Sequence, residues 1–93
     1  MVTAEEGTGD TDGALARHHE SLARHDLVDP STEPQHYRLE MDIRCRLGQT
    51  YTTAGRLSEA CEQFRAALAV PGAETHFLEH ARAEAGLGAC GTA

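Results

Sequence analysis

The amino-acid sequence predicts an all-α fold of about four helices, and three observations lead to this prediction. Apolar and small side chains recur at the three- and four-residue spacing of helices. Ala and Leu supply most of the apolar residues, whereas aromatic residues, which favour strands, are sparse, with two Phe, two Tyr and no Trp. Prolines and glycines fall between the periodic segments, where they end helices. The 93 residues suffice for one small domain.

The first expected helix follows a polar lead-in. Residues 1–9 are rich in Gly, Thr and acidic residues and are expected to be disordered, ahead of a helical domain over 10–90. Asp10 or Asp12 can cap the N-terminus of the helix. Its buried stripe is expected at Ala14, Leu15, His18, Ser21 and Leu22. The stretch "DLVDPSTEP" contains two prolines and ends this helix.

The second and third helices are expected to form an antiparallel hairpin. Thr32 followed by Gln35 resembles a capping box, which predicts a second helix over about 33–54. Gly55 can adopt the left-handed conformation that commonly closes a helix, and the connection there is short. The stripe of the second helix consists of Leu39, Ile43, Leu47 and Tyr51. The third helix has the clearest amphipathic pattern, with apolar positions at Leu57, Ala60, Cys61, Phe64, Ala67 and Leu68.

A fourth helix is expected over about 74–89, after Pro71 and Gly72 end the third. Comparison of the chain with itself shows an internal repeat. Residues 9–23 align with 55–69 at an offset of 46, and residues 35–51 align with 75–91 at an offset of 40. The chain therefore alternates two kinds of helix in the order B, A, B, A.

The hairpin segment "LGQTYTTAGRLSEACEQFRAAL" (47–68) resembles the tetratricopeptide repeat (TPR). The residues that match its pattern, and that the resemblance assigns to packing within the repeat, are Leu47, Gly48, Tyr51, Gly55, Ala60, Phe64 and Ala67. In this interpretation Gly48 and Ala60 are small where the two backbones approach. His18 and Gly91 depart from the pattern, because Phe and Tyr are expected there. The resemblance implies antiparallel hairpins stacked as a short right-handed solenoid, similar to the TPR arrays of actinobacterial pathway regulators.

The resemblance also implies a function. The A helices of TPR proteins line a groove that receives a partner, and the corresponding positions here are Asp42, Cys45, Gln49, Thr52 and Arg82. The clamp that binds acidic chaperone tails is not expected, because Cys45 and Gln49 replace its Lys and Asn. We therefore expect a non-catalytic protein–protein interaction module that binds another protein or peptide. So few repeats also predict a homodimer or docking through end helices that expose Leu15, Leu22, Phe77 and Leu87.

An alternative function rests on "HFLEH" (76–80). On a helix, His76 and His80 lie one turn apart, with Glu84 a turn further, and two His side chains at this spacing can bind zinc. This pattern predicts, as the alternative, a metal- or small-ligand-responsive helical domain. The leading expectation remains a solvated polar stripe with no metal and no cofactor. No set of nucleophile, base and orienting group can be assembled around Cys45, so an enzyme is not expected.

Charge and cysteine content exclude further classes. The net charge of −7 disfavours nucleic-acid binding, which requires a basic patch. No apolar run reaches the length of a membrane span. The three cysteines, Cys45, Cys61 and Cys90, form no C-x-x-C pair, so a disulfide framework is not expected. We therefore expect a cytoplasmic location.

Overall fold

The fold is that of a computed structural model, which describes residues 3–89 and their side chains from Thr11 onward. Its four α-helices are α1 (Thr3–Asp26), α2 (His36–Thr53), α3 (Leu57–Leu68) and α4 (Phe77–Ala89). Two short 3-10 helices, η1 (Pro30–Thr32) and η2 (Ala73–Thr75), lie in the connections, and the described residues form no strand. The predicted all-α class and the number of helices are confirmed.

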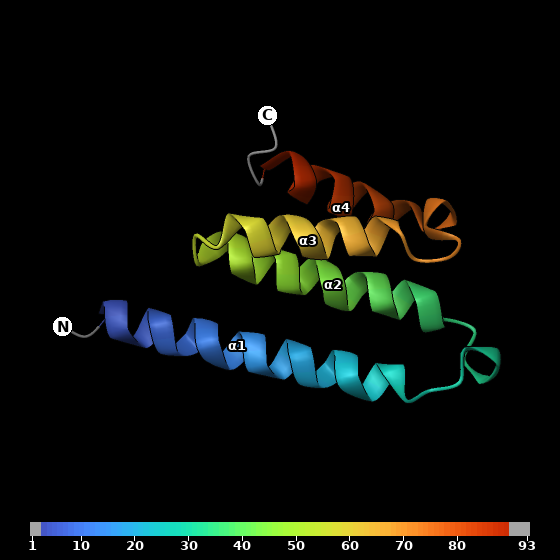
Figure 1. Cartoon of the computed structure of the whole chain (residues 1–93), viewed down its shortest axis with the longest axis horizontal. Coiled ribbons are helices and arrows are strands. Elements are labelled where there is room, and N and C mark those ends of the chain that lie inside the picture. The colour runs from blue at the N-terminus through green and yellow to red at the C-terminus, as the bar shows by residue number, and fades with distance from the viewer. Residues whose placement is uncertain (1–2, 90–93) are drawn as a thin grey trace.

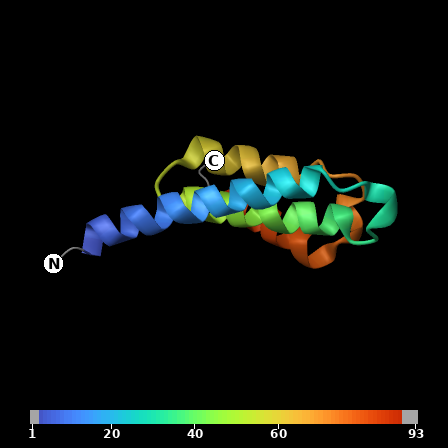
Figure 2. The same ribbon diagram turned by 90° about the horizontal axis from the view of Figure 1, so that it is seen from below.

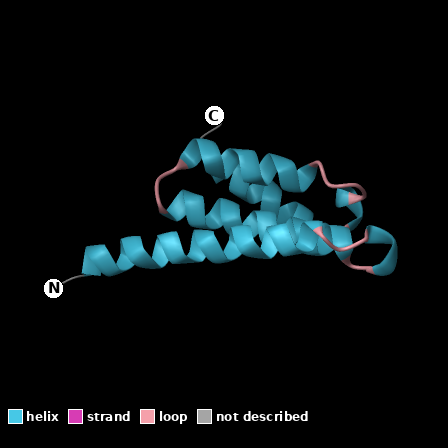
Figure 3. Cartoon of the chain, turned by 60° about the horizontal axis from the view of Figure 1, so that its bottom comes forward, coloured by secondary structure: helices cyan, strands magenta, loops and turns pink. Residues whose placement is uncertain are grey.

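The helices run antiparallel to their neighbours in chain order, from α1 at one side to α4 at the other (Figure 1). α2 packs against all three other helices, and α4 packs against both α2 and α3. The molecule is flattened, with principal extents of 49 × 32 × 18 Å. All connections between the helices are short loops or single 3-10 turns (Figure 3).

α1 begins at Thr3, whereas the sequence predicts a disordered lead-in over 1–9 and a start at Asp10 or Asp12. The helical part of that lead-in extends beyond the other helices (Figure 2). Extension of a formed helix costs far less than its nucleation, and Ala4, Glu5 and Glu6 favour helix. Residues 1 and 2, together with Cys90 and Gly91, lie outside the described residues.

α2 begins at His36 rather than at residue 33, and the expected capping box does not form. Glu33 precedes a proline and is extended, with φ −128° and ψ 104°, so the helix cannot run through it. The side chain of Thr32 donates to the carbonyl of Asp29, and Gln35 makes no side-chain cap. Asp29 instead caps η1 by accepting a hydrogen bond from the backbone N–H of Ser31 at 3.0 Å.

The tight α2–α3 hairpin depends on Gly55, whose φ of 80° is strained for any residue with a Cβ. The core of the hairpin centres on Phe64, which is 1% exposed. A Cβ on Gly48 would lie 2.6 Å from the tip of the Phe64 ring, and a Cβ on Gly86 would lie closer still. Gly48 therefore admits the ring of Phe64, and the same ring fixes α4 against the hairpin.

The expected exposure of the end helices is largely wrong. Leu15 is buried, and Leu22 and Leu87 are half-buried against the main core. They are covered because α1 packs along α2, and α4 packs along both α2 and α3. Phe77 is the exception among the four expected residues, with 82% of its surface exposed.

Candidate interaction surface

The five residues expected to line a partner groove lie on α2 and α4, which pack side by side. Asp42 and Arg82 are half-buried and form an ion pair across the two helices, with 3.5 Å between Arg82 Nη1 and Asp42 Oδ1. Gln49 is exposed, and Thr52 is half-buried with its hydroxyl donating to the carbonyl of Gly48. The structure thus brings Asp42 and Arg82 into contact within this set.

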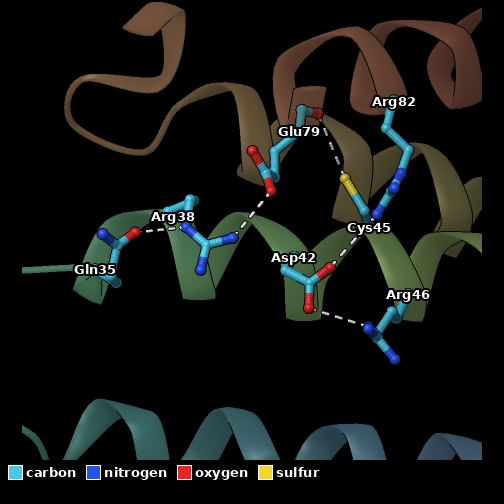
Figure 4. Close-up of polar contacts among 7 residues, drawn as sticks. All are labelled: Gln35, Arg38, Asp42, Cys45, Arg46, Glu79 and Arg82. Atoms are coloured by element: carbon cyan, nitrogen blue, oxygen red, sulfur yellow. Dashed lines mark hydrogen bonds and ion pairs between the residues drawn. The ribbon is translucent and has the colours of Figure 1, made fainter. Parts of the chain in front are cut away.

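Cys45 cannot belong to a partner surface, because its exposed fraction is 0% and it packs in the core beside α4. Its thiol donates a weak hydrogen bond to the backbone carbonyl of Glu79, with 3.8 Å between Sγ and the oxygen (Figure 4). Burial raises the pKa of this thiol from its ordinary value of 9.0 to about 11, against a smaller lowering effect of Arg82. The side chain therefore packs as a neutral thiol, and a nucleophilic role is disfavoured.

Polar contacts along α2 continue the junction with α4 (Figure 4). Arg38 Nη1 donates to Glu79 Oε2 at 3.2 Å, and the carboxylate side chain of Glu79 is only 9% exposed. Asp42 accepts a further hydrogen bond from Arg46 at 3.0 Å, so it lies between two arginines. The buried carboxylate of Glu79 requires a cationic partner such as Arg38, because desolvation of an unpaired charge is costly. These contacts orient α4 and hold its start against α2.

Glu79 is not among the site residues predicted from the sequence, although a signal for it is present. With the 40-residue offset, Glu79, Ala83 and Leu87 of α4 correspond to the apolar stripe Leu39, Ile43 and Leu47 of α2. A carboxylate at a stripe position is expected to need a cation nearby. Its partner Arg38 was not identifiable, because the contact joins positions 41 residues apart on two helices.

The structure buries the packing residues of the TPR-like hairpin apart from the turn residue Gly55, which is exposed. The buried set consists of Leu47, Gly48, Tyr51, Ala60, Phe64 and Ala67. At its edge, the hydroxyl of Tyr51 lies 2.9 Å from Nε2 of His19 on α1. His19 is therefore exposed but hydrogen-bonded rather than simply solvated. Burial, followed by the charge of Arg46, lowers the pKa of the half-buried His18, which favours a neutral imidazole.

The start of α4 carries an exposed apolar pair, Phe77 and Leu78, which are 82% and 64% exposed. Further along the helix, Ala81 and Ala85 are also exposed, and Gly88 has open space where its Cβ would lie. Phe77, Ala81, Ala85 and Gly88 follow one another at spacings of three or four residues, so they share one side of the helix. We call these four residues and Leu78 the α4 face.

The histidines of "HFLEH" do not form the predicted helical pair. His76 precedes α4, with φ −103° and ψ 78°, and its carbonyl accepts a hydrogen bond from the backbone N–H of His80 at 2.8 Å. His80 contacts Glu84, with 3.5 Å between Nδ1 and Oε1. Among residues 11–89, neither histidine belongs to a group of three side chains close enough to share a metal ion.

A different set of side chains has the composition of a metal site. His25 and His36 are buried, Glu40 is half-buried, and one ligand atom of each lies within 4.8 Å of those of the other two. The sequence does not predict this set, because His25 is on α1 and the other two are on α2. The i, i+4 spacing of His36 and Glu40 was a detectable signal.

The cysteines differ from the sequence expectation as well. Cys45 is a free thiol, whereas Cys61 is buried and takes part in a disulfide bond. The absence of a C-x-x-C pair therefore did not exclude a disulfide.

No helix in the described part of the chain combines the length and the hydropathy that a membrane span requires. Comparison of the chain with protein-family models, with curated proteins and with solved structures finds no match in any of the three.

Proposed function

We propose that this chain is a non-catalytic protein–protein interaction module built as a short TPR-like solenoid, and that the α4 face receives a helix of its partner. The observation that carries the proposal is the exposure of Phe77, whose counterpart in α2 is packed. The order of the packing is consistent with stacked hairpins, because α2 contacts α3 and α4 lies across both. An adaptor, or part of a regulator's repeat array, is the role that this architecture would serve.

The counterpart of Phe77 at the 40-residue offset is Tyr37. Tyr37 packs against Met41, Val70 and Ala73, which form a small core between α2, the end of α3 and η2. The connection after α3, together with η2, thus covers the aromatic residue of the A helix before α3, which is α2. No described residue follows α4, so nothing in the described chain plays this role for Phe77. A helix of another protein can take that place.

The same offset indicates the chemistry of the partner. Gly48 accommodates the ring of Phe64 from α3, whereas the equivalent Gly88 has open space. A partner helix that packs on α4 as α3 packs on α2 would place a large apolar or aromatic side chain opposite Gly88. It would also bring apolar residues to Phe77 and Leu78, because buried apolar area supplies most of the free energy of such contacts. The expected partner segment is therefore an amphipathic helix.

Capture from the native extract with the purified chain as bait tests this proposal. Phe77→Asp places a charge on the α4 face, and Gly88→Leu fills its open end. Leu27→Asp is the matched control, because Leu27 is 87% exposed but lies in the connection after α1. We expect the same partner to be captured by the wild type and by Leu27→Asp, and to be lost with Phe77→Asp and Gly88→Leu.

Two further measurements decide the interpretation. Circular dichroism must show equal helix content in all variants, since the altered side chains are exposed. Hydrogen exchange of the purified complex must then show slower exchange over 77–89 than in the free chain. Capture that survives both α4 variants, or protection confined to α1, would contradict the proposal. Sedimentation shows whether the bound helix belongs to a second copy of the chain.

A further inference from the structure

The C-terminal end of α1 and the first turn of α2 bring two imidazoles and a carboxylate together. His25 lies in the last turn of α1, His36 is the first residue of α2, and Glu40 follows one turn later. One ligand atom from each lies within 4.8 Å of the other two. The two rings stack, with 3.9 Å between their centroids and 21° between their planes. This His–His–Glu cluster is separate from the α4 face.

Both histidines of the cluster are more than nine-tenths buried, with exposed fractions of 8% and 7%. Nε2 of His25 and Nδ1 of His36 are each buried without a hydrogen-bond partner. Buried polar atoms are nearly always paired, so two orphaned nitrogens on adjoining rings call for a ligand. A divalent cation would satisfy such atoms, because the unprotonated nitrogen of an imidazole binds a metal ion through its lone pair.

The carboxylate of the cluster remains available to a cation. Glu40 accepts a hydrogen bond from Nε of Arg44 on Oε2 at 3.0 Å, and its side chain is 19% exposed. Oε1 has no partner among the described residues and can face a metal. The bond from Arg44 would orient the carboxylate, as outer hydrogen bonds do for metal ligands. Arg44 is itself held by Gln63 of α3, which accepts from its Nη1 at 3.2 Å.

The connection between the two helices is short and internally bonded, which limits how far the histidines can separate. Asp29 caps η1 through Ser31, and the side chain of Glu33 accepts a hydrogen bond from the backbone of Gln35. Tyr37 lies against His36 edge-on, with 5.0 Å between the ring centroids. The cluster therefore sits at a corner of the fold that is fixed by local contacts rather than on a free surface.

We propose that His25, His36 and Glu40 bind one Zn²⁺ ion. Two imidazoles and one carboxylate form a ligand set that zinc accepts, and the fourth position would hold water. Zinc at about 2.0–2.2 Å from each ligand places the ligand atoms about 3.4 Å apart, so any pair near the 4.8 Å limit must move closer. The nearly parallel rings must also turn, because both in-plane lone pairs have to point at one ion. Zinc would thereby clamp the end of α1 to the start of α2.

Titration of the metal-free full chain with ZnCl₂ in a calorimeter tests the proposal. We expect one zinc per chain with a dissociation constant in the micromolar range or tighter. His25→Gln and His36→Gln should each weaken binding at least 100-fold, and Glu40→Gln about tenfold, because the amide keeps an oxygen ligand but removes the carboxylate charge. The matched control is the double variant His76→Gln, His80→Gln, which removes the other histidine pair and should change the dissociation constant less than twofold.

A second readout keeps the test decisive if a glutamine variant fails to fold. In the wild-type chain, X-ray absorption of bound zinc should show nitrogen and oxygen ligands with two imidazoles and no sulfur. Nuclear magnetic resonance should show the ring signals of His25 and His36 shifting together with the stoichiometric zinc. The proposal is overturned by sulfur ligation, by loss of binding in the His76, His80 double variant, or by a wild-type chain that binds no zinc at micromolar concentration.

Discussion

α2 and α4 align over the internal repeat, yet one is enclosed and the other is half open. Around α2, Met41 and Cys45 are both 0% exposed, and Gly48 receives the ring of Phe64. Their counterparts in α4 at the 40-residue offset are Ala81, Ala85 and Gly88, which are all exposed. The two helices differ in their neighbours: α3 and α4 cover α2, whereas the described residues offer α4 only the elements before it.

This difference indicates that an A helix of this repeat takes part in two interfaces, one on each of its two sides. One side of α4 packs on the preceding helix, since Gly86 accommodates Phe64 of α3. The opposite side keeps small and apolar residues at the positions that are covered in α2. Exposed apolar area on a folded domain marks a site of association. The α4 face is therefore where the comparison predicts a partner.

Two phenylalanines give the largest contrast between the filled and the open interface. Phe64→Ala should lower the free energy of unfolding by about 3–5 kcal/mol, because it leaves a cavity between Gly48 and Gly86. Phe77→Ala should change it by no more than about 0.5 kcal/mol, since Phe77 is mostly exposed. Urea denaturation followed by circular dichroism measures both. Equal losses in the two variants would show that Phe77 is covered in the free chain.

Thiol reactivity compares the sides of α2 and α4 that face the next A helix. At pH 8 the pKa of about 11 leaves Cys45 about a hundredfold less thiolate than an ordinary thiol has, and α4 also blocks access. In an Ala85→Cys variant, the new thiol occupies the equivalent but exposed position. Alkylation with iodoacetamide, read by mass spectrometry of peptides, should modify position 85 at least a hundredfold faster than Cys45. Comparable rates at the two positions would contradict the packing of α4 over Cys45.

The sequence was sufficient for the helices and insufficient for what joins them. The stripe from Leu57 to Leu68 and the left-handed glycine at Gly55 are local signals, and α3 and the hairpin follow them. The start of α2 was misplaced because the restriction that Pro34 imposes on Glu33 outweighs the capping pattern. The expected groove residue Cys45 turned inward because its neighbour is α4, which lies 34 residues away in the chain.

The histidines illustrate the same limit. The "HFLEH" motif is easily recognised in the sequence, but His76 lies just before α4 and only His80 lies within that helix. His25 and His36 are 11 residues apart with two prolines between them, so no simple spacing connects them. They meet only because the loop through η1 returns the chain onto α1. Metal ligands from two helices depend on that return, which the sequence pattern does not encode locally.

The central claim is that α4 has a surface equivalent to the one on which α3 packs in α2, and that this surface of α4 is uncovered. One pair of substitutions tests this claim most directly. Gly48→Ala and Gly88→Ala make the same change at equivalent positions. Gly48→Ala should lower the free energy of unfolding by about 1–3 kcal/mol, because its Cβ would overlap the ring of Phe64. Gly88→Ala should raise it by up to about 1 kcal/mol, since alanine favours helix and no described side chain or neighbouring element lies within 4 Å of the new Cβ. A Gly88→Ala chain destabilised as much as Gly48→Ala would contradict the claim.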